Sequence, residues 1–538
     1  MKNDKQGIFQ HFPFNEIREG QKDVIEWAVK QFDENGKKVC IVEMPTGSGK
    51  SAVALTLAKH YGSAFWLTGS KMLQDQISGE FSENGTIEHS TTDLKGRNAY
   101  PCTIKLDKLI YTPRQISNWN LESHTCADGM CKKKGESRIM TCNCPYFNQV
   151  DKAKNAKIVT MNFSSFLCQT IHTDRFEPRK ILIIDEGHNA EQELLSFISL
   201  SLSSKEIDIE LPKYDNPTEY ATWLEKNDIM AKLEIKAAMY KTNEDIKMFD
   251  YINDIIGKLD VFLQEMATED ANWVVEYTND KFGSRILCKP IFISKFANQY
   301  LFSMADRILI MSATILDGDV IRESLGISKA ESTAKRIGST FPKENHKIKV
   351  CSLYKATGGQ AQQHIWGPDM TTAIDKIAAK HKNQRGIIHT HSYAIADMLV
   401  MECDEETKYR FTYQKDFADR SAAIEAHKAK PGSILISPSM SEGVDLKGEN
   451  GEFCIIAKMP FANFYDDKQL AARKELNENY YNLKTAMKLV QSLGRCIRNE
   501  TDTCTSYITD STFGWWYQNN QKMIPQWVKD SLDLKGKI

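Results

Sequence analysis

The sequence has no hydrophobic run long enough to cross a membrane. Along its 538 residues, no stretch approaches the roughly eighteen consecutive apolar residues of a transmembrane helix. The opening segment, MKNDKQGIFQHF, also contains no apolar core of signal-peptide length. We therefore expect a cytoplasmic protein without a membrane partner.

An excess of charge of either sign is missing as well. Lysine and arginine number 69, and aspartate and glutamate number 71, which gives a net charge of −2. The overall charge therefore predicts no polyanionic partner, and any binding of nucleic acid must come from a local groove. The 41% of hydrophobic and 26% of charged residues are ordinary for a globular protein. The length predicts about three or four domains.

A disulfide framework is not expected either, because the thirteen cysteines are odd in number and the cytosol keeps thiols reduced. Four cysteines nevertheless gather between residues 124 and 147, and a fifth lies a short way upstream. These five are Cys102, Cys126, Cys131, Cys142 and Cys144. Their spacing predicts a metal site. From spacing alone, an iron–sulfur cluster and a zinc ion are about equally favoured, and a chance grouping without metal is the remaining alternative.

Short apolar runs bounded by turn residues recur in both halves of the chain. Runs of this kind, buried on both faces, are typical of parallel strands in α/β sheets. The first set lies at 38–44, 180–186 and 307–314, and the second at 385–391, 433–439, 452–459 and 504–510. Helical patterns separate these runs, so we predict an α/β protein with one parallel sheet in each half.

Two segments interrupt the first sheet. Residues 102–150 contain the clustered cysteines and little strand pattern. Residues 199–290 are rich in lysine and glutamate, and their apolar residues recur at three- and four-residue spacing, as in amphipathic helices. Within this second segment, NWVVEYTNDKFGSRILC predicts a hairpin around 279–283. The simplest interpretation of 199–290 is a helical insertion without chemistry of its own.

The stretch VEMPTGSGKS (42–51) follows a predicted strand and precedes a helical run, as a phosphate-binding loop does. Glycines allow the backbone N–H groups to face phosphate oxygens. Lys50 would reach the β- and γ-phosphates and Ser51 would bind magnesium. The generic pattern has glycine where this chain has Met44. The candidate nucleotide-binding residues of the loop are Thr46, Gly47, Ser48, Gly49, Lys50 and Ser51.

A second predicted strand ends in adjacent carboxylates in ILIIDEGHNAE (181–191). Asp185 would lie near the metal ion, and Glu186 would polarise the water that attacks the γ-phosphate. An acidic pair after a strand is a weak signal alone, because exposed strand ends are often acidic. Together with the upstream loop it predicts an ATPase.

The segment LVQSLGRCIRNE (489–500) is interpreted as a helix near the end of the chain. Gln491, Arg495 and Arg498 are spaced to share one face of it. If that face looks across a cleft at the nucleotide, the arginines become arginine fingers, which contribute roughly 10³–10⁵ in rate to related phosphoryl transfers. The alternative is a solvated or salt-bridged surface. An ATP site shared by two domains would make the protein a motor.

Together, these segments resemble superfamily 2 helicases, and within them the iron–sulfur XPD/DinG family. EMPTGSGKS resembles the first motif, and DEGHNAE resembles the DEAH box with Gly187 in place of alanine. Four further stretches match in the family's order and carry the candidate residues listed here: FNEIREGQKDVI (14–25) with Arg18 and Gln21 on the adenine side, LIMSATI (309–315) with Ser312 and Thr314, SPSMSEGVDLKGE (437–449) with Glu442, Gly443 and Asp445, and QSLGRCIRNETD with Gln491, Arg495 and Arg498.

The resemblance implies a fold of two RecA-like motor domains with an iron–sulfur insertion and a helical arch insertion in the first. The expected segments are 1–101, 151–198 and 291–335 for motor domain 1, 102–150 for the cluster domain, 199–290 for the arch, and 336–538 for motor domain 2. The family's frame in CNCPYFNQVDKAKNAKIVTMNFSSFL (142–167) points to Cys144 as the fourth ligand of a 4Fe–4S cluster, after Cys102, Cys126 and Cys131. Cys142 would then be a bystander.

The resemblance also implies the activity: an ATP- and magnesium-dependent DNA helicase that moves 5′ to 3′ along single-stranded DNA and acts at DNA junctions, as a monomer. His188 joins the candidate catalytic residues through the DEAH box. One alternative is a nucleic-acid-binding switch whose ATPase is stimulated by single strands without unwinding. Another is a nuclease, because some relatives carry a fused exonuclease domain, but this chain reaches Arg18 before such a domain would fit.

Overall fold

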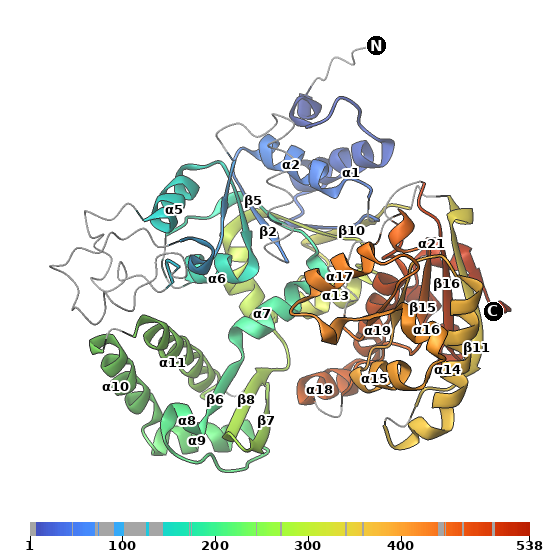
Figure 1. Ribbon diagram of the computed structural model, residues 1–538. Helices are drawn as coiled ribbons and strands as arrows, with labels where there is room; N and C mark the ends of the chain where they lie inside the picture. Colours follow the sequence, from blue (N-terminus) through green and yellow to red (C-terminus); the bar gives the residue numbers. More distant parts are fainter. Residues whose placement is uncertain are drawn as a thin grey trace.

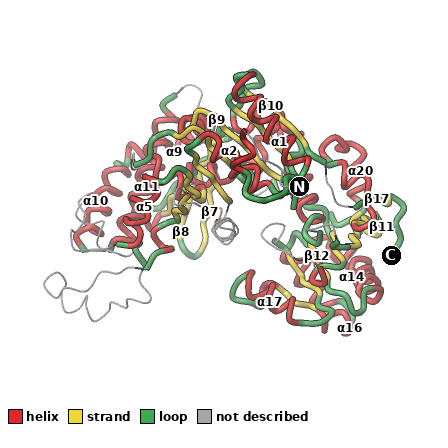
Figure 2. Tube along the Cα trace, turned by 90° about the horizontal axis from the view of Figure 1, so that it is seen from above, coloured by secondary structure: helices red, strands yellow, loops and turns green. Residues whose placement is uncertain are grey.

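The computed structural model describes residues 7–45, 47–69, 74, 91–101, 125–127, 144–171, 173, 175–243, 245–268, 272–338, 342–357, 360–439, 446, 448–464, 467–497 and 501–538. Figure 1 shows two bodies that each contain a twisted sheet, and a third region of helices and short strands that extends from the first body. Viewed at right angles, helices α10 and α11 lie at one end of the molecule and helices α14, α16 and α17 at the other (Figure 2).

The first body is built on a seven-stranded sheet whose pairings are all parallel. The strand order is β10 (Ser332–Arg336), β1 (Val39–Glu43), β9 (Ala305–Ser312), β5 (Arg179–Ile184), β2 (Ala64–Thr68), β4 (Ile158–Asn162) and β3 (Thr91–Leu94). The apolar runs expected at 38–44, 180–186 and 307–314 are β1, β5 and β9, respectively. In the sheet these three strands are neighbours, with β9 between β1 and β5. Because parallel strands end at the same edge, the segments that follow these three strands meet there.

Helices cover both faces of this sheet, and this explains why its central strands are apolar throughout: all five residues of β1 and of β2 are buried. The longer helices of this body are α1 (Glu19–Val29), α2 (Lys50–Tyr61), α5 (Pro145–Asn155), α6 (Phe163–Ile171), α7 (Ala190–Ile198), α12 (Ser294–Tyr300) and α13 (Gly318–Leu325).

The second body contains another seven-stranded parallel sheet. Its order is β13 (Phe411–Tyr413), β14 (Ile434–Ser437), β12 (Gly386–His389), β15 (Phe453–Ile456), β16 (Cys504–Asp510), β11 (His346–Tyr354) and β17 (Leu532–Asp533). Its helices are α14 (Gln363–Lys380), α15 (Tyr393–Glu402), α16 (Glu405–Arg410), α17 (Arg420–Ala429), α18 (Lys468–Leu476), α19 (Glu478–Leu493), α20 (Thr512–Asn520) and α21 (Gln526–Ser531). The four strands expected in this half are β12, β14, β15 and β16, so the prediction of two parallel sheets is confirmed.

The third region lies between β5 and β9 in the sequence and joins helices to a three-stranded antiparallel sheet. The helices are α8 (Ser204–Ile207), α9 (Pro217–Lys226), α10 (Ile229–Thr242) and α11 (Ile246–Met266), and the strands are β6 (Leu200–Ser203), β7 (Trp273–Asp280) and β8 (Gly283–Pro290). The expected hairpin is present, since β7 and β8 pair from Trp273 with Pro290 to Asp280 with Gly283. The region is therefore not entirely helical. Among the described residues, no helix combines the length and the apolar character that a membrane crossing needs.

Candidate nucleotide and metal sites

The phosphate loop connects β1 to α2, as predicted. Gly47 and Gly49 adopt left-handed backbone angles, with φ of 76° and 81°, and α2 begins at Lys50 directly after them. A side chain on Gly49 would also collide with Gln21, whose Nε2 lies 2.1 Å from the position of a Cβ atom. These glycines let the chain turn so that the first N–H groups of α2 face outward, where they can bind an anion. Thr46 lies outside the described residues.

Two residues expected beside the adenine instead contact the phosphate loop. Arg18 donates from Nη1 to the Gly47 carbonyl at 2.8 Å, and Gln21 donates from Nε2 to the Ser48 carbonyl at 3.2 Å. Gln21 also accepts a hydrogen bond from the Arg18 N–H at 3.0 Å, which joins the two at the start of α1. Both side chains therefore help to hold the shape of the loop.

Sequence reasoning missed a buried glutamate at the end of β1, just before the loop. Glu43, the last residue of β1, accepts a hydrogen bond from the Leu316 N–H at 2.7 Å and pairs with Arg336 at 3.0 Å. Burial raises the pKa of Glu43, and the contacts with Arg336 and Leu316 act in the opposite direction. The carboxylate thus ties the end of β1 to the segment after β9 and to β10. A charged residue directly before the loop was the available signal.

The acidic pair follows β5, at the same sheet edge as the loop. Asp185 is only 7% exposed, and its carboxylate accepts a hydrogen bond from the Glu186 N–H at 3.0 Å. Burial, followed by the negative charge of Glu186, raises the pKa of Asp185 to about 6, whereas Lys50 lowers it. A buried carboxylate that is costly to ionise, with a lysine nearby, suits a divalent cation. Glu186 has a φ of 50°, a conformation that is unusual for a residue with a side chain.

A chain of hydrogen bonds leads from the second body to Glu186. Gln491 of α19 donates from Nε2 to the His188 Nε2 at 2.7 Å. This contact assigns the ring proton to Nδ1, which lies 2.7 Å from the Ser312 hydroxyl. Ser312 in turn donates to Glu186 Oε2 at 3.5 Å and accepts from the Thr314 N–H at 3.0 Å. The structure therefore brings together five of the candidate residues, and they come from both bodies.

Gly187 departs from the alanine of the DEAH box for a steric reason. A Cβ atom added to Gly187 would lie 2.3 Å from Cγ2 of Ile310, a β-branched side chain in the centre of β9. Ile310 is fully buried, so it cannot move aside cheaply. Glycine thus lets the segment after β5 pack closely against β9.

One prediction about the last motif was wrong. The helix expected across 489–500 ends at Leu493, and Gly494 caps it with hydrogen bonds from its N–H to the carbonyls of Val490 and Ser492. Arg495 therefore lies after the end of the helix and does not continue the face of Gln491, which it follows by four residues. Arg498, Glu442, Gly443 and Asp445 lie outside the described residues.

Comparisons with known proteins match this arrangement at the level of sequence families. A model described as helicase C-terminal domain matches residues 375–531, and one described as type III restriction enzyme, res subunit, matches residues 14–216. The ATP-dependent DNA helicase CHL1 of Debaryomyces hansenii is 27% identical over 130 residues, which cover 21% of this chain and 16% of that protein. Both halves of the chain are therefore similar in sequence to known families, and the second half is similar to a helicase C-terminal domain.

Solved structures titled as XPD proteins share the fold over nearly the whole chain. A solved structure titled XPD_Helicase superposes with a TM-score of 0.66 at 15% identity, covering 94% of this chain and 98% of that one. The structure of S. tokodaii Xpd4 gives 0.57 at 12% identity, covering 96% and 100%. A regulator of telomere elongation helicase 1 homolog from Drosophila ananassae is 30% identical over 105 residues, 17% of this chain and 10% of that protein. The match to each of these two curated relatives thus spans a sixth of its length or less.

In this chain, two of the candidate cysteine ligands are described, and they lie side by side. The Sγ atoms of Cys126 and Cys144 are 3.6 Å apart, and both side chains are buried, at 2% and 5% exposure. Cys126 also donates to the Pro101 carbonyl at 3.3 Å, next to the position of Cys102 in the sequence. Thiols that converge in this way fit either an iron–sulfur cluster or a zinc ion. Cys102, Cys131 and Cys142 lie outside the described residues.

Proposed function

We propose that the protein is an ATP- and magnesium-dependent DNA helicase that moves 5′ to 3′ along single-stranded DNA. The observation that carries this proposal is the contact between the two bodies at the acidic pair, where Gln491 reaches His188 at 2.7 Å. An ATPase that is shared between two parallel-sheet domains can convert hydrolysis into a change in their separation. The similarity to a DNA helicase favours DNA as the track, and the polarity rests on resemblance to the XPD/DinG helicases alone.

The proposed roles in ATP hydrolysis follow the geometry of the sheet edge. Lys50 and the first N–H groups of α2 bind the phosphates, and Ser51 and Asp185 hold magnesium, which neutralises charge on the phosphate oxygens. Glu186 accepts a proton from the attacking water, while His188 and Ser312 hold its carboxylate in place. Arg495, and Arg498 beyond it, complete the site from the second body.

We also propose that Cys102, Cys126, Cys131 and Cys144 hold a 4Fe–4S cluster. The contact between Cys126 and Cys144 supports a shared metal site, and the family resemblance favours iron–sulfur over zinc. Its role would be structural, because a domain of fewer than about fifty residues cannot bury enough core without a metal. Iron and acid-labile sulfide in the purified protein, lost in Cys144→Ser, are the expected result. One zinc ion with no iron would contradict the cluster.

The helicase proposal is tested by unwinding duplexes that carry a single-stranded tail of either polarity. We expect ATP-dependent strand displacement from the substrate with a 5′ tail and none from the 3′-tailed substrate. Lys50→Ala should abolish hydrolysis and displacement while leaving the affinity for single-stranded DNA within about twofold, because the proposed role of the lysine is to bind the phosphates of the nucleotide and not the DNA.

Two results would contradict the proposal in different ways. Single-strand-stimulated hydrolysis without displacement of either substrate would favour the nucleic-acid-binding switch. Displacement by Lys50→Ala at the wild-type rate would remove the phosphate loop from the mechanism. Unwinding of the 3′-tailed substrate alone would overturn only the polarity.

A further inference from the structure

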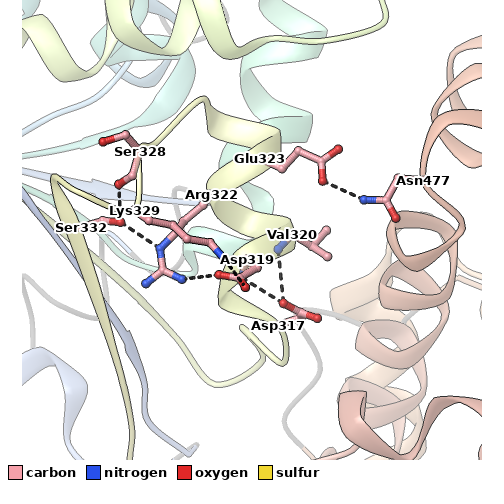
Figure 3. A network of polar contacts seen from close by, with 9 residues as sticks. All are labelled: Asp317, Asp319, Val320, Arg322, Glu323, Ser328, Lys329, Ser332 and Asn477. Atoms are coloured by element: carbon pink, nitrogen blue, oxygen red, sulfur yellow. Dashed lines mark hydrogen bonds and ion pairs between the residues drawn. The ribbon is translucent and has the colours of Figure 1, made fainter.

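Helix α19 of the second body contacts the first body at its beginning, middle and end. At its beginning, Asn477 donates from Nδ2 to the Glu323 carboxylate of α13 at 2.7 Å (Figure 3). At its end, Gln491 reaches His188. In the middle, Tyr480 and Lys484 both reach Glu191, the second residue of α7. Glu191 is the last residue of the DEGHNAE stretch, but the middle contact has no role in the proposal above.

Glu191 is a buried carboxylate that is held by groups of the second body. Its side chain is about 7% exposed, and Oε2 lies 2.9 Å from Lys484 Nζ and accepts a hydrogen bond from the Tyr480 hydroxyl at 3.0 Å. Oε1 lies 3.6 Å from Nη1 of Arg473, a residue of α18 with no exposed side-chain surface. Burial alone would raise the pKa of Glu191, but the charges of Lys484 and Arg473 outweigh it and lower the pKa.

The partners of Glu191 are themselves fixed in place. The guanidinium of Arg473 lies over the Tyr480 ring at 4.0 Å and over the Phe292 ring at 4.5 Å. It also donates from Nη2 to the Ser324 hydroxyl at 3.0 Å. One glutamate thus pairs with the buried Arg473 and with Lys484, whose side chain is 22% exposed, and removing its charge would take away this counterion across the boundary between the bodies.

The position of Glu191 connects this ion network to the ATP site. Glu191 follows His188 by three residues, in the short segment that leads from the acidic pair into α7. Lys484 and Gln491 are seven residues apart on α19, so two turns of one rigid helix separate the two contacts and place them on one face. Whatever sets the position of Lys484 against α7 therefore also sets the distance from Gln491 to His188.

We propose that Glu191 is a positioning residue for ATP hydrolysis: by pairing with Lys484, Tyr480 and Arg473, it docks α19 so that Gln491 orients His188, Ser312 and, through them, Glu186. This inference rests on the proposed ATPase function. It assigns a role to a residue that does not itself touch the nucleotide.

The test is a double-mutant cycle on the kcat of ATP hydrolysis in the presence of single-stranded DNA, using Glu191→Gln and Gln491→Ala. Each single change should lower kcat about tenfold with the KM for ATP within about twofold, because phosphate binding by Lys50 is untouched. If Glu191 acts through Gln491, the double variant should be no slower than the slower single variant. Losses that multiply in the double variant, or an unchanged kcat in Glu191→Gln, would overturn the proposal.

Three further variants separate positioning from loss of fold. Lys484→Met removes a different member of the network and should show the same non-additivity with Gln491→Ala, so the test survives if Glu191→Gln does not fold. Lys484→Arg keeps the charge and should retain most of the wild-type kcat. Glu323→Gln changes the carboxylate of α13 that Asn477 contacts at the beginning of α19, and it should leave kcat unchanged. A wild-type protein without DNA-stimulated hydrolysis would refute the proposed function, whereas additive losses in an active protein would refute only the role of Glu191.

Discussion

Asp185 and Glu191 are both buried carboxylates, but their surroundings give them opposite properties. Glu191 lies against two cations and a tyrosine hydroxyl, so its ionised form is stabilised by the fold. Asp185 is buried and has the negative Glu186 beside it, and Lys50, the Glu186 N–H and His188 offset these effects only in part, so its pKa rises to about 6. The first arrangement stabilises the docking of the two bodies, and the second leaves a carboxylate that gains most from a bound cation.

Asp185→Asn should stabilise the metal-free protein at neutral pH. Because the pKa of Asp185 is raised from 3.8 to about 6, the folded state binds a proton more tightly than the unfolded chain between these values, and stability falls as the pH rises through them. Asparagine does not ionise, so the variant should gain about 2–3 kcal/mol in the free energy of unfolding at pH 7.5 and nothing near pH 3.5. Urea denaturation in EDTA at both pH values measures this.

The matched control for this prediction is Glu186→Gln, whose side chain is 28% exposed and should gain less. Equal stability of wild type and Asp185→Asn at pH 7.5 would show that the carboxylate is not strained by its surroundings. Loss of magnesium-dependent ATP hydrolysis in the same variant would show that the added stability comes at the expense of function.

Residues with local sequence signals could be found without the structure, and residues with distant partners could not. The loop, the acidic pair and the last motif each have a recognisable pattern around Lys50, Asp185 and Gln491. Glu191 and Tyr480 are 289 positions apart and pair only because two bodies meet, so neither residue stands out in its own segment. The contacts of Arg18 and Gln21 with the loop depend in the same way on how α1 packs.

At the scale of elements, α19 is fixed by its cap as well as by its face. Asn477 accepts a hydrogen bond from the Asn479 N–H at 3.0 Å, so it is the N-cap of α19 and also the residue that bridges to Glu323. Figure 3 shows the other side of this contact, where Asp317 caps α13 and Arg322 and Lys329 pair with Asp319. The N-cap of α19 therefore meets the C-terminal half of α13, whose N-terminal end is capped by Asp317.

Asn477→Ala should lower the free energy of unfolding by about 1 kcal/mol, because the first turn of α19 loses its cap. Asn477→Ser keeps a capping oxygen and loses only the bridge to Glu323, so it should retain most of the stability. Thermal or urea unfolding of the three proteins measures the difference. An alanine variant as stable as wild type would show that the cap contributes nothing to this helix.

Sequence reasoning located β1, β5 and β9 because they are apolar on both faces, but it missed β2 and β4 of the same sheet, which are also largely buried. It also missed strands at the margins. β10 has the sequence STAKR, with exposed residues in alternation, and it forms the edge of the first sheet. β11 alternates between buried and exposed residues over its first half and pairs with only a short strand on its outer side. The premature end of α19 depends on Gly494, a capping residue that a face-spacing argument does not weigh.

At the scale of the whole molecule, the strand order explains how distant segments form one site. β1, β9 and β5 are adjacent, so the phosphate loop, Ser312 and the acidic pair leave the same edge of the first sheet. The second body then adds α19 to that edge, and α7 lies between the first sheet and the helices of the second body (Figure 1). The topology thus supplies the first half of the site, and the docking of the two bodies supplies the second.

The most direct test of this shared site is the kcat of ATP hydrolysis in Arg495→Ala, measured beside the Kd for ATP. If the nucleotide is held from both bodies, kcat should fall by roughly 10³ while the Kd changes much less, because an arginine finger stabilises charge that develops during phosphoryl transfer. A kcat within about threefold of wild type would show that the first body hydrolyses ATP alone.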